Sequence, residues 1–360
     1  MTIFKPLASD DRVSTKTLLH EAIPITGTIV SGTYSDSNIQ NFAHGMFQSV
    51  YDYPYLSSSA NHIFDITFGT SGDSNLVVTE QAAKKDNIYN QMAQVLAGYD
   101  KFGNVQKFDE DGDLTGGTKI NDAVFLSFSR LLVKDEIDKG TFQLELGLSS
   151  SFTTGIFDQR VTIKDTDAST SYRVNSPAGE YGILYISNSA GDSATQKALN
   201  GITGSKEQAC GLIYYQAGVA VITSSVFMST SDGGFLSSSC NFFDASTTFT
   251  GSLISEEISG SADALRKRIY NLQFNNTIEL NSTVYFCRAK HNEFNYSSNP
   301  TYLSGSEIRV KNQQSDTPIS YITSIGLYSA DNQLLAVGKF SEPLRKDKTV
   351  ELTFRARLDY

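Results

Sequence analysis

Alternation of apolar and polar residues near the C-terminus constrains this chain more than any other feature of its sequence. Val350, Leu352, Phe354, Ala356 and Leu358 are each followed by a polar or charged residue. Successive side chains of a β-strand point to opposite faces, so this period of two predicts a strand with one buried and one solvated face. The charges on the solvated face discourage unwanted pairing at a sheet edge.

Two further strands are expected just before this one. Residues 322–328 and 333–340 have strand composition, and the residues between them, Ser-Ala-Asp-Asn, are typical of a hairpin turn. Residues 319–360 are therefore predicted to form a three-stranded antiparallel meander, which is stable only if one face is buried. Because an edge strand offers unpaired N–H and C=O groups, we expect an assembly interface at Phe354, Arg355 and Arg357.

The rest of the chain also favours strands. Alternation recurs over residues 142–148, and residues 211–226 are apolar enough for buried strands. Only 39% of the residues are hydrophobic and 19% are charged, but the chain holds 22 Phe and 18 Tyr. Aromatic residues with many short polar ones favour strands and turns. The predicted fold is mainly β (α+β), with antiparallel, sandwich-like sheets and a few short helices.

Three helices and three domains are expected. Apolar residues at helical spacing predict helices over about 38–52, 81–97 and 262–272. In the second of these, Ile88, Met92, Val95 and Leu96 form the expected apolar stripe. The predicted domains are an N-terminal β domain with the first two helices (1–145), a β-rich middle domain (146–255), and a short helix followed by an antiparallel β domain (256–360).

Charge and cysteine content limit which cellular compartment and which classes of partner are expected. A net charge of −10 argues against nucleic acid, because phosphate contacts need clustered Lys and Arg. The N-terminus lacks the pattern of a signal peptide, and no apolar run reaches the 18 residues of a membrane span, so membrane insertion is not expected. Three widely spaced cysteines, an odd number, predict free thiols and assembly in a cytoplasm.

An acidic loop is the one candidate for a bound cation. Asp109, Asp111 and Asp113 have the spacing of the first three ligands of a calcium loop. The glycine and glutamate that such a loop needs later are replaced by Leu114 and Ile120. The loop is therefore interpreted first as a solvated acidic turn, with a bound cation as the alternative.

Catalytic motifs are missing from the sequence. The four histidines stand in no metal or nucleophile motif, and the chain has neither a Walker loop nor a dinucleotide-binding glycine pattern. We therefore expect a protein that is not an enzyme and uses no cofactor.

Tyr51, Tyr53 and Tyr55 lie in an aromatic run and are candidates for a protein or sugar contact; a packed corner between a helix and a loop is the other interpretation.

The sequence contains the blocks HGMFQSVYDYPYLSSSANHIFDITFG (44–69) and YITSIGLYSADNQLLAVGKF (321–340), together with residues 4–34, 87–100, 125–142, 172–184, 211–223, 299–306 and 341–360. Taken together, these blocks run nearly end to end and resemble a virion structural protein of T4-like contractile-tailed phages, of the kind that infect marine cyanobacteria and other marine bacteria. Variable loops separate these blocks. The resemblance carries no catalytic motif.

The resemblance implies a tail or baseplate subunit, with the baseplate as the favoured position, located in the virion and assembled in the host cytoplasm. Its expected partners are further copies of the chain and other tail or baseplate proteins. One alternative is a fibre or decoration protein that binds a receptor or glycan, and another is a structural protein of the neck or capsid. A virion-borne envelope hydrolase would be the enzymatic alternative.

Overall fold

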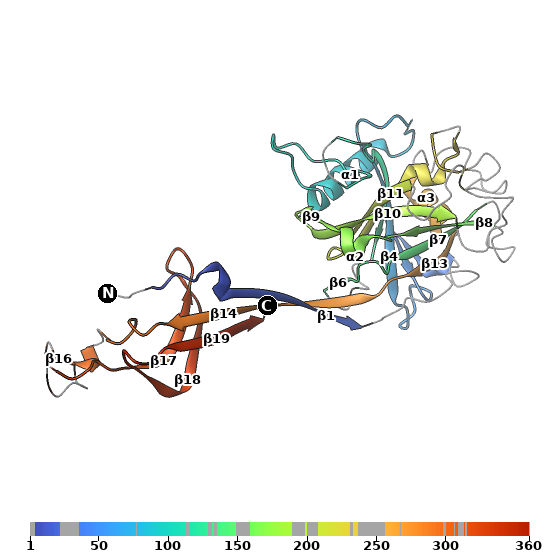
Figure 1. The fold of residues 1–360 in the computed structure, drawn as a ribbon. Helices are drawn as coiled ribbons and strands as arrows, with labels where there is room; N and C mark the ends of the chain where they lie inside the picture. The colour runs from blue at the N-terminus through green and yellow to red at the C-terminus, as the bar shows by residue number, and fades with distance from the viewer. Residues whose placement is uncertain are drawn as a thin grey trace. The chain divides into compact units, whose positions relative to one another are not determined.

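The computed structural model describes residues 4–21, 36–76, 78–112, 116–128, 132, 135–148, 159–188, 199, 208–230, 233–236, 256–266, 268–297, 300–305, 307–308, 313 and 315–359. Within these residues the fold is mainly β, with antiparallel sheets and three α-helices, which confirms the predicted fold class (Figure 1).

The chain divides into two compact units. The central unit comprises His20–Ile278, and the terminal unit combines Met1–Leu19 with Glu279–Tyr360. The chain passes between them twice, within β1 (Arg12–Glu21) and within β14 (Asn276–Ala289). This division differs from the predicted domains, which followed the chain in order.

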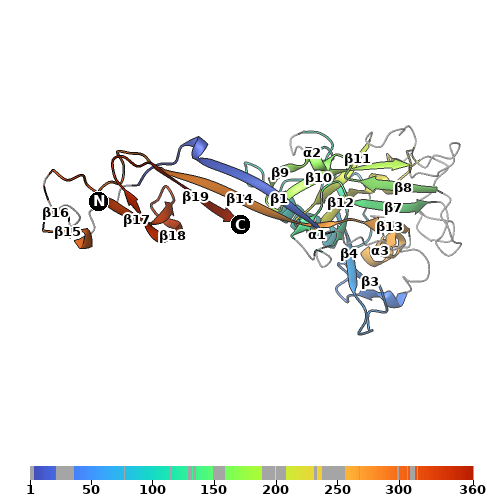
Figure 2. The same cartoon turned by 60° about the horizontal axis from the view of Figure 1, so that its bottom comes forward.

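An eleven-stranded antiparallel sheet forms the central unit, and Figure 2 shows its strands β8, β7 and β13 side by side. In sheet order the strands are β13 (Ile269–Gln273), β7 (Gln143–Leu148), β8 (Gln159–Lys164), β10 (Gly179–Asn188), β11 (Gln208–Tyr214), β12 (Val219–Thr223), β5 (Asp122–Ser127), β4 (His62–Thr70), β3 (Gln48–Tyr51) and β2 (Ile39–Asn41), with β9 (Arg173–Ser176) beside β10. The short β6 (Glu136–Ile137) pairs with the first residues of β14.

The middle of this sheet is buried, as the apolar run at 211–226 predicted. Every residue of β12 is buried, and so are the last five residues of β11. Gly211 allows the two strands to approach, because a Cβ at this position would lie 2.1 Å from the carbonyl oxygen of Val221. The predicted alternation over 142–148 is also correct, since Leu144 and Leu146 of β7 are fully buried.

Helix α1 (Ala82–Leu96) confirms the helix expected over 81–97, and it packs on β4. Gly98 ends it in the left-handed conformation, with φ of +85°, and its N–H donates to the carbonyl oxygen of Ala93 at 2.9 Å. The expected buried stripe is wrong at Val95, which is 64% exposed, because Tyr89 and Ala93 face the sheet instead. No helix of the described residues is long and apolar enough to cross a membrane.

The other two helix predictions need correction. Residues 38–52 form β2 and β3, which pair with each other around Gly45, and β3 pairs with β4. Ile39 and Val50 lie opposite each other and are buried, so pairing at a sheet edge overrides their helical spacing. Helix α3 (Ile258–Arg266) begins and ends earlier than expected, because the following residues join the sheet as β13. The remaining helical elements are α2 (Ala168–Ser171) and the 3₁₀ turns η1 (Ser9–Asp11), η2 (Asp36–Asn38), η5 (Ser224–Phe227) and η7 (Pro300–Tyr302).

Neither predicted domain boundary is found. Residue 145 lies inside β7, so a boundary there would divide a strand that pairs with both β8 and β13. Residue 255 precedes α3, which packs on β3 and β4. Antiparallel pairing between distant strands therefore joins strands from all three predicted domains in one sheet.

The terminal unit contains two facing sheets. One has the order β1, β14, β19 (Leu352–Asp359), and the other is the hairpin of β17 (Ser320–Tyr328) and β18 (Leu334–Lys346). A small pair, β15 (Leu303–Ser304) and β16 (Glu307–Ile308), precedes them. All three C-terminal strands exist, but the predicted meander is wrong: β19 pairs with β14 and not with β18.

Candidate functional site

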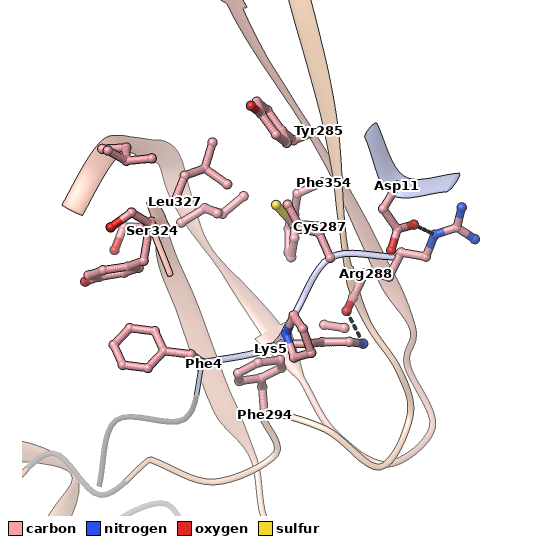
Figure 3. A pocket seen from close by; sticks show the side chains of 18 of the residues that line it. Phe4, Lys5, Asp11, Tyr285, Cys287, Arg288, Phe294, Ser324, Leu327 and Phe354 are labelled. Atoms are coloured by element: carbon pink, nitrogen blue, oxygen red, sulfur yellow. Dashed lines mark hydrogen bonds and ion pairs between the residues drawn. The ribbon is translucent and has the colours of Figure 1, made fainter. Parts of the chain in front are cut away.

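A large apolar groove lies inside the terminal unit. Its volume is about 700 Å³, which is in the usual range for binding sites in proteins. Figure 3 shows side chains from β14, β17 and β19 and from the N-terminal segment around it. The apolar lining includes Phe4, Leu7, Tyr285, Cys287, Phe294, Ile322, Ile325, Leu327, Phe354 and Leu358.

Strand alternation and register place the groove between the two sheets. β14 and β19 pair so that Cys287 lies opposite Phe354 and Tyr285 opposite Ala356. Residues opposite each other in antiparallel strands share a face, so all four point to the same side. From the other sheet, Phe340 of β18 meets Phe354 with 4.8 Å between ring centres. The alternation seen in the sequence thus builds one wall of the groove.

The N-terminal segment crosses one end of the groove. Phe4 packs edge-on against Tyr328 of β17, with ring centres 4.7 Å apart. Lys5 Nζ donates to the carbonyl oxygen of Arg288 at 2.8 Å and to Glu293 Oε2 at 2.5 Å (Figure 3). The hydrogen bond from Lys5 lowers the pKa of the Glu293 carboxyl, which favours its carboxylate form. Asp11 and Arg288 form a second pair at 2.7 Å.

The turn between β18 and β19 is held by a buried cation. Lys346 is fully buried, and its Nζ donates to Asn295 Oδ1 at 2.6 Å and to the carbonyl oxygen of Asp347 at 2.9 Å. Thr349 donates twice to Asp347 Oδ1, and these bonds lower the pKa of that carboxyl. The turn therefore fixes the position of β19 relative to β18.

Chemically, the groove favours binding over catalysis. Cys287 is its one thiol, and burial followed by the Asp11 carboxylate raises the pKa of that thiol, which keeps it protonated and poorly nucleophilic. The charged lining residues, Lys5, Asp11 and Arg288, are engaged in the pairs described above. A smaller cavity of about 310 Å³ in the central unit is lined by Gln143, Lys164 and Gln273 among others, without a carboxylate, histidine or cysteine.

Burial differs sharply between the two units. Among the described residues, 50 hydrophobic residues are buried; 48 lie in the central unit, and only Val284 and Ala289 lie in the terminal unit. The side chains on the inner face of the hairpin are only half-buried, including Ile322, Leu327 and Phe340. Two apolar side chains of β18 are more exposed still: Leu335, which lines the groove, by 67%, and Val337 by 61%.

The predicted interface residues do not form one surface. Phe354 lines the groove, whereas Arg355 and Arg357 occupy the alternate positions of β19 and point to the other face of its sheet. Arg357 donates to Ser282 and to Asp359 on that face.

Tyr51, Tyr53 and Tyr55 belong to the central unit. Tyr51 is half-buried and donates to Gln40 Oε1 at 2.9 Å, so it has a packing role. Tyr53 is 57% exposed, Tyr55 is 37% exposed, and the neighbouring Leu56 is 85% exposed. The aromatic run thus includes both a packed residue and an exposed aromatic surface.

Part of the acidic loop is engaged by a lysine. Asp109 is buried and forms an ion pair with Lys119, while Asp113 lies outside the described residues. Burial, then the carboxylates of Asp109 and Asp111, raises the pKa of Glu110 to about 7. Within the described residues, no group of three His, Cys, Asp or Glu is placed to hold a metal ion.

A buried ionic cluster in the central unit is not predicted by the sequence. Lys139 lies 2.7 Å from both Glu136 and Glu180, and its Nζ lies 5.4 Å from the ring centre of Tyr215. Tyr215 in turn donates to Asp165 at 3.1 Å. These residues come from four separate segments without a local motif, so only the folded chain brings them together. Lys139 lies between two carboxylates of opposite charge, as a buried lysine requires, and the cluster lines neither of the two cavities described above.

The residues lining the groove were also only partly foreseen. Alternation in β19 identified Phe354, but no local signal marks Phe4 or Cys287, which reach the groove through long-range pairing.

The comparisons with known proteins gave no match: no protein-family model matches the chain, and neither a curated protein nor a solved structure resembles it significantly.

Proposed function

We propose that this protein is a non-enzymatic structural subunit of a phage particle, in the tail or baseplate, and that it assembles through its terminal unit. The observation that carries the proposal is the contrast in burial: 48 buried hydrophobic residues in the central unit against two in the terminal unit, among the described residues.

A unit with so few buried residues needs a partner to be stable. Ordering one residue costs about 1–2 kcal/mol of conformational entropy, and burial of apolar surface is the main compensation. The terminal unit leaves its apolar side chains half-buried in the groove or exposed on the hairpin. Surfaces of this kind form the apolar centre of obligate protein interfaces.

A macromolecular partner fits better than a small ligand. A small apolar molecule would fill the groove of about 700 Å³ but would leave the exposed side chain of Val337 on the hairpin in water. Only a protein surface covers both. The tail or baseplate assignment is drawn from the sequence resemblance, and a neck or capsid position would use the same contacts.

The direct test is association with particles. In gradient-purified particles from cells producing the protein, we expect the chain to co-sediment in a fixed ratio to the other virion proteins. Phe354→Asp, which puts a carboxylate into the groove, is expected to reduce incorporation at least about tenfold. Leu56→Asp, at an exposed position of the central unit, is the matched control and should be incorporated normally. A wild-type chain that stays in the soluble fraction would refute the proposal.

A receptor- or glycan-binding role is the second candidate, favoured by the exposed Tyr53, Tyr55 and Leu56. It predicts binding to a glycan array that Tyr53→Ala removes, because aromatic faces stack on sugar rings. An array without binding would leave assembly as the function of the chain.

A further inference from the structure

The N-terminal segment, residues 4–11, joins the two sheets of the terminal unit at one end of the groove, and we call it the strap. At one side Phe4 packs against Tyr328 of β17, with ring centres 4.7 Å apart. At the other side Lys5 Nζ donates to the carbonyl oxygen of Arg288, near the end of β14, at 2.8 Å (Figure 3). The strap and both sheets line the same groove, so the strap takes up part of the space that a partner would need.

Side chains, and not backbone pairing, hold the strap in place. Residues 4–8 belong to no helix or strand, and no backbone hydrogen bond joins residues 4–7 to the rest of the described chain. Within the described residues, Lys5 makes the hydrogen bonds that tie residues 4–7 to the sheets, to Arg288 and to Glu293. The side chains of Lys5 and Glu293 are each 30% exposed. Exposed pairs of this kind contribute little to stability, so releasing the strap should cost less free energy than releasing a strand.

The apolar side chains of the strap are only partly buried. Phe4 is 45% exposed and Leu7 is 41% exposed, although both line the groove. The groove volume of about 700 Å³ is the space that remains with the strap in place. The strap therefore fills its end of the groove incompletely, and an apolar surface that buries more area can replace it.

The other end of the strap is tethered and lies beside a cysteine. Asp11 accepts a hydrogen bond from Arg288 Nε at 2.7 Å, and β1 begins at the next residue and belongs to the same sheet as β14. Burial, followed by the Asp11 carboxylate, raises the pKa of the Cys287 thiol, so this thiol lies close to the tethered end. A strap that loses its Lys5 contacts thus stays attached to the sheet, and Cys287 can report its release.

We propose that the strap is a displaceable cover of the groove, which occupies one end of the groove in the free chain and is released when a partner protein enters. This inference rests on the proposed assembly function and adds a step that regulates it. The partner replaces the strap with side chains of the same kind: a basic group for Glu293 and the Arg288 carbonyl, and an aromatic or aliphatic group for Tyr328. Surfaces that lack these groups must displace the strap without compensation, which disfavours incorrect association.

Labelling of the Cys287 thiol in the native full-length protein, followed by peptide mass spectrometry, measures release of the strap. Lys5→Ala removes the anchor and should raise the labelling rate about threefold to tenfold. Lys107→Ala is the matched control, because the Lys107 side chain is also 30% exposed and pairs with a carboxylate, Asp73, in the central unit. This control should label at the wild-type rate. Equal rates in Lys5→Ala and wild type, or an equal rise in Lys107→Ala, overturn the proposal.

A peptide with the sequence of residues 4–11 tests the strap as an occupant of the groove. Added in large excess to the Lys5→Ala protein, it should bring the labelling rate of Cys287 to within about twofold of wild type, because it covers the vacated end. The same peptide with Lys5→Glu should have no effect, since its carboxylate would face Glu293. Failure of the native peptide, or equal slowing by both peptides, contradicts the proposed contacts.

Incorporation into particles separates this inference from the proposed function. Produced together with wild type, the Lys5→Ala chain should be enriched in particles by about the factor by which its labelling rate rises, because more of it is ready to bind. Depletion of a Lys5→Ala chain that labels faster would make the strap part of the interface and overturn its displacement. If neither chain enters particles, the proposed function fails, whereas faster labelling would still show that the strap opens.

Discussion

At the scale of single residues, Glu110 shows how local charge density affects stability. Burial and two neighbouring carboxylates raise the pKa of Glu110 from 4.5 to about 7 in the folded state. Between these values the folded protein binds a proton more tightly than the unfolded chain, so the free energy of unfolding falls as pH rises through this window. Glu110 therefore lowers the free energy of unfolding at neutral pH and has no such effect in acid.

We expect Glu110→Gln to leave stability unchanged near pH 4 and to raise it by about 1 kcal/mol at pH 8. The expected gain is below the full linkage value because the side chain is half in water. Urea unfolding at both pH values measures the difference, with Glu80→Gln on an exposed carboxylate as the control. An equal effect at both pH values would rule out this titration as the cause.

Gly211 is a residue whose role depends on backbone contact. A Cβ at Gly211 would meet Val221 O at 2.1 Å and Ile222 Cα at 3.1 Å, and both atoms are backbone of the adjacent strand. Gly211→Ala should therefore push β11 away from β12 and lower the free energy of unfolding by about 3 kcal/mol. Gly72→Ala, where a Cβ meets nothing within 4 Å, is expected to change it by less than about 0.5 kcal/mol. Similar losses in both variants would contradict the close approach.

At the scale of elements, α1 is a helix whose presence follows from its sequence and whose orientation depends on the sheet. Neighbouring residues test that orientation. Leu96 is 2% exposed and Val95 is 64% exposed. Leu96→Ala should cost about 2–4 kcal/mol of unfolding free energy, and Val95→Ala less than about 0.5 kcal/mol. Thermal or urea unfolding of the two variants is sufficient, and a reversed order would restore the stripe that the sequence predicted.

Strand pairing shows the same division between local and distant information. The period of two in β7 and β19 predicts a strand and its buried face, because alternation is local. It does not predict which strand will pair with it. β19 pairs with β14, which begins about 75 residues earlier in the sequence, although β18 precedes it directly. The same limitation explains residues 38–52, where the partner strand β4 decided between helix and sheet.

At the scale of the whole molecule, the two units should respond differently to association. Cys210 lies in the core of the central unit, and Cys287 lines the groove of the terminal unit. In urea, Cys287 should become reactive first. Raising the protein concentration should move its midpoint to higher urea, because the assembly proposed for the terminal unit, with further copies of the chain among its partners, stabilises only that unit. The midpoint for Cys210 should not move.

Pulsed thiol labelling with peptide mass spectrometry measures these midpoints separately. The third cysteine, Cys240, lies outside the described residues and is distinguished by its own peptide. A single transition that exposes both thiols at one urea concentration, independent of protein concentration, would contradict the difference in burial between the units.

The sequence by itself determined the mainly β fold class, helix α1, the buried strands near 211–226 and the inward position of Phe354, because each follows from spacing within one segment. The tertiary structure alone decided the division into two units and the groove, because these depend on which distant strands pair and on how much surface remains exposed afterwards. Local periodicity specifies the faces of a strand, but only the folded chain shows whether a face has found a partner.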